Sequence, residues 1–178
     1  MIITLIGYRG SGKSSVAAPL ADALGWNWID ADDEIERRTG CSIREIFKNA
    51  GESRFRELEE ETLDELLSRN QLVIAAGGGA ILSEKTCEKM KSSGPVVWLK
   101  ASVDILASRI DSDVTTTERR PNLTSQGGRQ EIENVLAVRE PLYRDCATLT
   151  VDTDTSHIRE IVTSILNSIQ TNNEGRNR

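Results

Sequence analysis

The stretch Gly7–Ser14, which reads GYRGSGKS, fits the phosphate-binding pattern G-x-x-x-x-G-K-[ST]. The apolar run Ile2–Ile6 stands before it and predicts a buried strand. Apolar residues recur at helical spacing after it, at Val16, Leu20, Ala23 and Leu24. A glycine-rich turn that fits the pattern by chance is the alternative, but strand, loop, helix is the context that this pattern requires. We therefore expect a loop that binds a nucleoside triphosphate.

The residue types of this loop suit a polyphosphate. Glycines let the backbone close around the anion, and N–H groups at the helix N-terminus point at it. Lys13 adds a mobile positive charge, and the Ser14 hydroxyl suits Mg²⁺. Pro19 lies inside the predicted helix, where it should kink the helix or remove a hydrogen bond.

The composition predicts one domain with a small partner. A chain of 178 residues with 38% hydrophobic content can bury one sizeable core. Its 22 basic and 28 acidic side chains give a net charge of −6, which argues against a nucleic acid or a membrane surface as the main partner. The N-terminus leads directly into a strand, and no apolar run approaches membrane-spanning length. We therefore expect a cytoplasmic protein, and nothing in the sequence demands a dimer, so we expect a monomer.

The cysteines and the single histidine give no sign of a metal or redox centre. Cys41, Cys87 and Cys146 lie far apart in the sequence and form no C-x-x-C pair, so neither a zinc site nor a disulfide framework is indicated. We expect buried free thiols in a reducing compartment. His157 opens the last predicted helix, where a surface or capping role fits better than acid–base catalysis.

The rest of the chain alternates strands and helices. Four more strands are predicted, at Trp26–Asp30, Leu72–Ala76, Val96–Lys100 and Thr148–Asp152. Because helical patterns separate them, the sequence predicts an α/β fold with a five-stranded parallel sheet and helices on both faces. We expect one domain over residues 1–170 and a frayed tail over residues 171–178.

Two helices that follow the second strand carry clear local signals. Gly40 is placed to end one helix, and Ser42–Glu45 forms a capping box that opens the next. From Ser53 to Ser68 one helical stripe consists of Phe55, Leu58, Thr62 and Leu66. The acidic residues on the other faces are a solvated surface by default, and they are Glu57, Glu60, Glu61 and Asp64.

Asp30 and Asp32 follow the end of the second predicted strand. In open α/β sheets ligands gather beyond the carboxyl ends of the strands, which is also where the phosphate loop lies. Asp30 could therefore hold Mg²⁺, directly or through water, and Asp32 could accept a proton or a hydrogen bond from an incoming hydroxyl. The alternative is that both aspartates only cap the next helix. These residues alone leave the two interpretations equally weighted.

Seven segments, in this order, make the chain resemble the shikimate kinase family, a branch of the P-loop kinases related to nucleoside monophosphate kinases. They are the phosphate loop; Asp30-x-Asp32; Arg38–Gly40 with Ser42–Ile43 and Ile46–Phe47; Gly51–Glu52 with Phe55–Arg56 and Glu59; Gly77–Gly79; Arg120-Pro121; and Arg139 with Pro141–Tyr143. Each segment alone is a weak signal, but the set covers roughly residues 1–170. The resemblance implies a three-layer α/β/α P-loop kinase fold with a helical substrate-binding region at about residues 31–62 and a mobile lid at about residues 111–129.

The resemblance also implies site residues. ATP would contact Gly10, Ser11, Gly12, Lys13, Ser14, Ser15, Arg109 and Arg120, and shikimate would contact Asp32, Arg56, Gly78, Gly79 and Arg139. The residue chemistry agrees, because the shikimate carboxylate calls for arginine and its hydroxyls call for a carboxylate and backbone N–H groups. Arg56 could instead be a surface arginine paired with Glu52 or Glu60, and Gly77–Gly79 could be a generic flexible loop.

The segment from Asp111 to Arg129 is polar and has few apolar anchors, as expected of a mobile loop. In the family this is the lid over ATP, and Arg120 then corresponds to the lid arginine that reaches the transferring phosphoryl group. Because the segment is longer than the family's minimal lid, Arg119 could take this role instead. Arg109 resembles an arginine that packs against adenine, and Asp152–Asp154 resembles the loop beside the base.

The resemblance implies an enzyme that transfers the γ-phosphoryl group of ATP to the 3-hydroxyl of shikimate, in the pathway to chorismate and the aromatic amino acids. The expected catalytic residues are Lys13, Asp32 and Arg120, and Ser14 and Asp30 would organise Mg²⁺. A gluconate-type kinase of the same fold is an alternative, although it would not need both Arg56 and Arg139. A non-catalytic nucleotide-dependent binding module is another.

Overall fold

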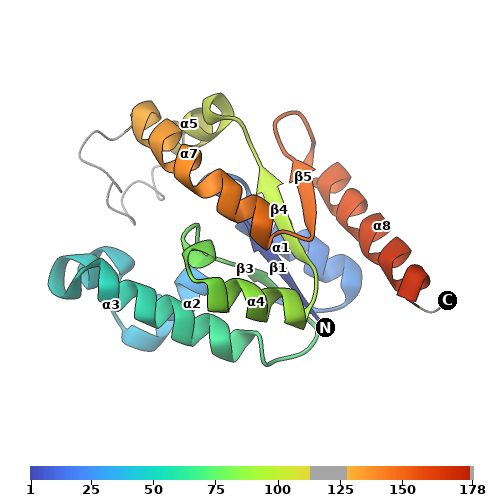
Figure 1. The fold of residues 1–178 in the computed structure, drawn as a ribbon, viewed down its shortest axis with the longest axis horizontal. Coiled ribbons are helices and arrows are strands. Elements are labelled where there is room, and N and C mark those ends of the chain that lie inside the picture. Colours follow the sequence, from blue (N-terminus) through green and yellow to red (C-terminus); the bar gives the residue numbers. More distant parts are fainter. Residues whose placement is uncertain (113–127, 177–178) are drawn as a thin grey trace.

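The computed structural model describes residues 1–112 and 128–176, with side chains as far as residue 171. A parallel sheet with the order β2-β3-β1-β4-β5 forms its centre (Figure 1). The strands are β1 (Ile2–Ile6), β2 (Asn27–Asp30), β3 (Leu72–Ala75), β4 (Val96–Lys100) and β5 (Leu149–Asp152). The predicted α/β fold is confirmed, and each strand agrees with its prediction to within one residue at either end.

Helices pack on both faces of the sheet and make three layers. They are α1 (Lys13–Leu24), α2 (Ala31–Thr39), α3 (Ile43–Leu66), the 3₁₀ helix η1 (Ala80–Leu82), α4 (Glu84–Ser93), α5 (Val103–Ser112), α7 (Gly128–Cys146) and α8 (Ile158–Arg176). Because side chains alternate along a strand, β1 presents Ile3 and Leu5 to α1 and α8, and Ile2 and Ile6 to the layer of α3, α4 and α7. All four side chains are almost fully buried.

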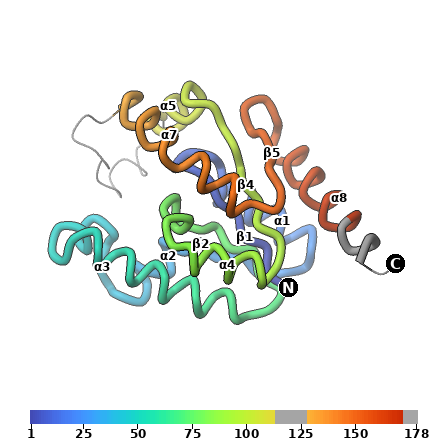
Figure 2. Tube along the Cα trace, viewed as in Figure 1, coloured from blue at the N-terminus to red at the C-terminus, as the bar shows by residue number. Residues whose placement is uncertain are grey.

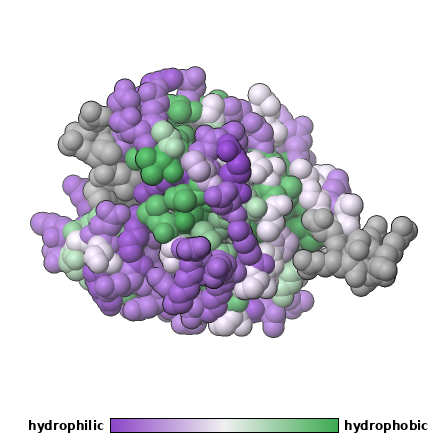
Figure 3. Space-filling model, in the orientation of Figure 1, coloured by the Kyte–Doolittle hydropathy of each residue, from purple (hydrophilic) through white to green (hydrophobic). Residues whose placement is uncertain are grey.

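Two helix pairs extend the molecule beyond the sheet. α2 packs on α3 through Ile35, Ile43 and Phe55, and α5 packs beside α7 through Ile110 and Ile132. Figure 2 shows the two pairs separated at one end of the molecule. Between α7 and the α3–α4 layer, apolar side chains gather near the centre of the face that Figure 3 shows, while most of that face is hydrophilic.

Most local helix signals hold, including the expected division between two helices within α3. The Ser42 capping box is present, and Gly40 ends α2 with φ 67°. α3 contains both helices expected here, and a non-helical break divides them at Gly51, where φ is 79° and ψ is 175°. α1 accommodates Pro19 within its length, and Ala23, expected on its apolar stripe, is exposed.

The expectation that all three thiols are buried needs correction. Of the cysteines only Cys146 is buried, because Cys87 is half-buried and Cys41 is exposed. The Cys87 thiol donates to the Ile81 carbonyl oxygen at 3.6 Å. The backbone of the tail expected to fray continues α8 as far as Arg176. Within residues 1–112 and 128–176, no helix is both long enough and apolar enough to cross a membrane.

The carboxyl ends of the parallel strands lie at one edge of the sheet. β1 leads into Gly7, β2 ends at Asp30, β3 is followed by Gly77–Gly79, and β5 is followed by Thr153. Segments that are distant in the sequence therefore meet there, as expected for an open α/β sheet.

Candidate active site at the carboxyl edge of the sheet

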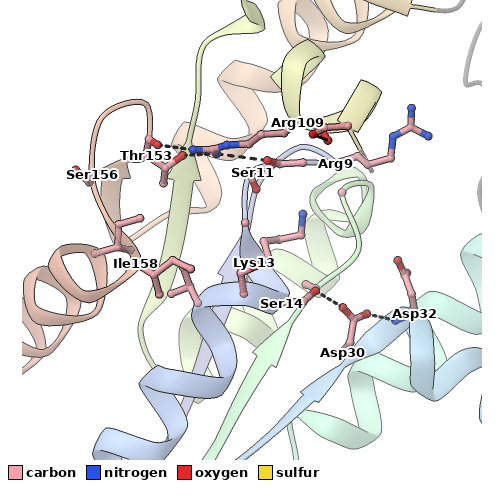
Figure 4. Close-up of a pocket in the computed structure, with 18 residues that line it drawn as sticks. Arg9, Ser11, Lys13, Ser14, Asp30, Asp32, Arg109, Thr153, Ser156 and Ile158 are labelled. Atoms are coloured by element: carbon pink, nitrogen blue, oxygen red, sulfur yellow. Dashed lines mark hydrogen bonds between the residues drawn. The ribbon is translucent and has the colours of Figure 1, made fainter. Parts of the chain in front are cut away.

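A cavity of about 470 Å³ opens at this edge. Its walls include the phosphate loop with Lys13, the two aspartates after β2, Gly78, Arg109 and Thr153, as Figure 4 shows for the side chains. One site thus contains cationic, acidic and glycine-rich segments that four different strands position. A volume of this size is in the range of small-molecule sites.

The phosphate loop is formed by close backbone packing. Gly7 has φ 144°, and a Cβ there would lie 2.6 Å from the Leu99 carbonyl oxygen, so no larger residue fits. Gly12, with φ 90°, precedes the first turn of α1. Lys13 Nζ donates to the carbonyl oxygens of Gly7, at 2.8 Å, and Tyr8, at 3.0 Å. The lysine therefore spans the loop and keeps its charge at the anion-binding position.

Ser14, Asp30 and Asp32 form a connected group. The Ser14 hydroxyl donates to Asp30 Oδ2 at 2.5 Å, and the Asp32 N–H donates to Asp30 Oδ1 at 2.9 Å. Asp30 is therefore the N-cap of α2, as the capping alternative expected, and also the partner of the phosphate-loop serine, while its magnesium role stays a prediction. Asp32, in the first turn of α2, lines the cavity.

Arg56 is held by two carboxylates. Its guanidinium donates to Glu59 Oε2 at 2.7 Å and to Glu52 Oε1 at 3.0 Å. The alternative of a surface arginine expected Glu52 or Glu60 as its partner. Glu52 is one partner, but the other is Glu59, which is only 3% exposed. Burial raises the pKa of the Glu59 carboxyl, and the Arg56 and Arg139 guanidiniums oppose that rise. Arg56 therefore has a buried acidic partner, and together with Gly79 it lines a second cavity of about 370 Å³.

The Gly77–Gly79 turn is buried and closely packed, which excludes the generic flexible loop. A Cβ at Gly77 would collide with Glu59 Oε1, and a Cβ at Gly79 would collide with the Arg56 guanidinium. The Gly78 carbonyl oxygen accepts hydrogen bonds from Arg139 at 3.2 Å and from the Tyr143 hydroxyl at 2.5 Å. The turn thus joins the two arginines that were expected to bind one carboxylate.

Arg109 joins the phosphate loop to the segment after β5. Its guanidinium donates to the Thr153 carbonyl oxygen at 2.7 Å, to Thr153 Oγ1 at 3.2 Å and to the Gly10 carbonyl oxygen at 3.4 Å. Thr153 is only 1% exposed. The sequence expected both segments near the nucleotide base, and they adjoin the same cavity.

Known proteins that are similar to this chain identify its family. The profile of one family, described as shikimate kinase, matches residues 9–170. The chain belongs to the shikimate kinase family. The shikimate kinase of Rhodopirellula baltica is 47% identical over 162 residues, which are 91% of this chain and 87% of that protein. The shikimate kinase of Chlorobium chlorochromatii is 39% identical over 173 residues, which are 95% of this chain and 90% of that protein.

Solved structures separate the family from its fold relatives. Shikimate kinase from Acinetobacter baumannii, solved in complex with shikimate, has a TM-score of 0.89 at 39% identity and covers 96% of this chain and 93% of its own. A gluconokinase from Sinorhizobium meliloti has a TM-score of 0.60 at 21% identity, and the match covers 97% of this chain and 93% of the gluconokinase. The second likeness concerns the fold alone, so the gluconate-type alternative gains no support from it.

Some expected site residues lie outside the described part. Arg119 and Arg120 fall within residues 113–127, so neither can be assigned as the lid arginine of this family member. The lid expected at about residues 111–129 overlaps the end of α5 at residues 111–112 and the start of α7 at residues 128–129, and it stays a prediction.

Two residues of the site had no assigned role in the sequence. Glu59 lies four residues after Phe55, on the buried stripe of α3, and that spacing was the available signal. Tyr143 is fully buried, and its ring stacks on Trp98 with centroids 5.8 Å apart. Burial raises the pKa of Tyr143 to about 12, so its hydroxyl stays protonated and can donate to Gly78.

Proposed function

We propose that this protein transfers the γ-phosphoryl group of ATP to the 3-hydroxyl of shikimate, giving shikimate 3-phosphate and ADP. Family membership supports the activity. The observation that carries the proposal is the contact between the two substrate regions. The Gly78 carbonyl oxygen accepts a hydrogen bond from Arg139. An ideal Cβ built at Gly78 would lie 3.4 Å from the Gly7 carbonyl oxygen of the phosphate loop. A bound acceptor would therefore adjoin the terminal phosphate.

The acceptor chemistry follows from charge and burial. Arg56 and Arg139 would bind the shikimate carboxylate through their planar guanidiniums, and Asp32 with the Gly78–Gly79 backbone would bind its hydroxyls. Asp32 would orient the attacking hydroxyl or take its proton. Lys13 and the loop N–H groups would hold the β- and γ-phosphates, where a fixed positive charge stabilises the transition state. From the sequence, Arg120 would add a second cation.

Ser14 and Asp30 fit a magnesium ion that is bound together with the nucleotide. Their hydroxyl and carboxylate oxygens lie 2.5 Å apart at the mouth of the phosphate loop. Mg²⁺ prefers oxygen ligands and takes few of them from a protein, the rest coming from water and phosphates. When bound, it would neutralise phosphate charge. Monomeric state and cytoplasmic location remain predictions from the composition.

A coupled assay of ADP release tests the function. ADP release from ATP and Mg²⁺ should depend on added shikimate and should not respond to gluconate. ³¹P NMR of the product should show one phosphate, on the 3-oxygen. Release that needs gluconate instead would favour the fold relative, and the absence of release with either acceptor would favour a binding module. The Lys13→Met variant is the control for contaminating kinases, because it should be inactive.

A further inference from the structure

Arg9, within the phosphate loop, carries a charged side chain to which the proposed function gives no role. It is half-buried, and its Nε atom is buried without a hydrogen-bond partner in the described structure. Leaving a buried donor unpaired costs free energy, more so when the donor is charged. Native proteins rarely keep such a group without a ligand or a function.

The other half-buried arginines of the described residues have partners. Arg56 pairs with Glu59, Arg109 donates to Thr153, and Arg139 donates to Gly78. The exposed Arg38 also has a partner, Glu34. Within residues 1–112 and 128–171, Arg9 forms neither an ion pair nor a hydrogen bond with its guanidinium, so its charge is available to an anion.

The position of Arg9 indicates which anion. It lines the same cavity as Lys13, Asp32 and Gly78, and its backbone nitrogen lies 3.7 Å from an ideal Cβ at Gly78. In Figure 4 its side chain leaves the phosphate loop away from Arg109 and Thr153. Arg9 and Arg139 also both lower the pKa of Tyr8 against the effect of burial, as expected if they share a neighbourhood. Arg9 therefore stands on the acceptor side of the loop.

We propose that Arg9 binds the phosphoryl group as it passes from ATP to the acceptor, and then the phosphate of the product. The inference rests on the proposed function. In the step, the acceptor hydroxyl oxygen bonds to the γ-phosphorus, and the bond from that phosphorus to the bridging oxygen breaks, with its electron pair leaving on ADP. The hydroxyl proton passes to Asp32 or to water. A guanidinium beside the equatorial oxygens offsets their charge throughout.

This role differs from those of the other cations. Lys13 donates to the Gly7 and Tyr8 carbonyls inside the loop, Arg56 pairs with Glu59, and Arg139 donates to the Gly78 carbonyl. Arg9 alone of these four has no such anchor among the described residues. It should therefore favour the phosphorylated product over shikimate itself, because only the product carries the phosphate.

Calorimetry on Arg9→Met with three separate ligands tests the proposal. Affinity for shikimate 3-phosphate should fall roughly 10-fold to 100-fold, the range of one charge-assisted hydrogen bond, while affinities for shikimate and for ADP·Mg²⁺ change less than about 3-fold. kcat should fall by a similar factor with little change in the KM for shikimate. Arg9→Lys should recover part of both losses, since it restores the charge without the planar fork.

The matched control is Arg69→Met, the same change at the opposite edge of the sheet. Arg69 is exposed, pairs with Glu65 and precedes β3, so its loss should leave all three affinities and kcat unchanged. Normal product affinity in Arg9→Met, or an equal loss for shikimate and product, would overturn the role of Arg9. If wild-type protein neither binds shikimate 3-phosphate nor forms it, the proposed function fails instead.

Discussion

At the residue scale, the two carboxylates that hold Arg56 differ in their surroundings. The Glu52 side chain is 58% exposed, whereas that of Glu59 is 4% exposed. An exposed ion pair contributes little because water screens it, and a buried one is costly to break because it leaves an unpaired charge. Glu59 therefore fixes Arg56, and Arg56 in turn fills the space that Gly79 leaves.

Replacing Arg56 or Arg139 with alanine should weaken shikimate binding and spare the nucleotide. Loss of a charge-assisted hydrogen bond to the carboxylate should cost roughly 2 to 4 kcal/mol, or about 30-fold to 1,000-fold in kcat/KM for shikimate. Calorimetry with shikimate and with ADP·Mg²⁺ separates the two sites. Arg54→Ala is the control, because Arg54 lies on the same helix with an exposed partner. Unchanged shikimate binding in both variants would refute the acceptor site.

Gly79→Ala should act through Arg56. The backbone at Gly79, with φ −104°, accepts alanine without strain, so the collision of the new Cβ with the Arg56 guanidinium is the main effect. Shikimate affinity should fall almost as far as in Arg56→Ala. In the Arg56→Ala background the same substitution should lower shikimate affinity less than about 3-fold, because the guanidinium that the new Cβ would displace is absent. A double-mutant cycle measures this coupling between the two residues. Additive losses in the cycle would mean that Gly79 acts independently of Arg56.

At the element scale, charged residues join α2 to α3. Glu34 of α2 is 7% exposed and accepts hydrogen bonds from Arg37 and Arg38. Arg38 also reaches Glu65 of α3 at 2.9 Å. With the small apolar cluster around Phe55, these contacts orient the two helices that carry Asp32 and Arg56.

Glu34 should make stability depend on pH. Hydrogen bonds, first from Arg37, lower the pKa of Glu34 to about 2 from an ordinary 4.5. Because the folded pKa is the lower one, the stabilisation is fully present above pH 4.5 and is lost as pH falls toward 2, amounting to at most about 3 kcal/mol. Urea unfolding between pH 7 and pH 3 should show a steeper loss for wild type than for Glu34→Gln. Parallel curves would show that the ion pair contributes no stability.

At the scale of the whole molecule, the sheet edge brings a nucleotide region and an acceptor region together. The phosphate loop, Arg109, Thr153 and Gly78 line the cavity of about 470 Å³, and the Gly78 carbonyl oxygen accepts from Arg139. Arg56 and Gly79 line a second cavity of about 370 Å³. Both regions belong to one folded unit, so a ligand in either should stabilise the whole chain.

Each substrate should raise the melting temperature on its own. A ligand at 100 times its Kd contributes about 2.7 kcal/mol, which for a chain of this size is roughly 5 to 10 °C. In thermal-shift assays shikimate and ADP·Mg²⁺ should each produce such a shift in wild type. Arg56→Ala should keep the ADP·Mg²⁺ shift and lose most of the shikimate shift at the same concentrations. Loss of both shifts would indicate damaged folding rather than a lost contact.

The sequence by itself determined the features that depend on residues close together in the chain. The phosphate loop, the capping box at Ser42 and the five strands follow from short patterns, because backbone conformation and burial period are local properties. The acidic pair after β2 was also placed at the correct edge, since parallel strands end together.

Only the tertiary structure decided the packing of charged groups. Glu59 interrupts an apolar stripe, and its burial is tolerable only because Arg56 pairs with it beside Gly77. Tyr143 donates to Gly78 across 65 residues of sequence, and Arg109 reaches Thr153 across 44. A buried polar group is stable only when the fold supplies its partner, and no local pattern encodes a partner that far away.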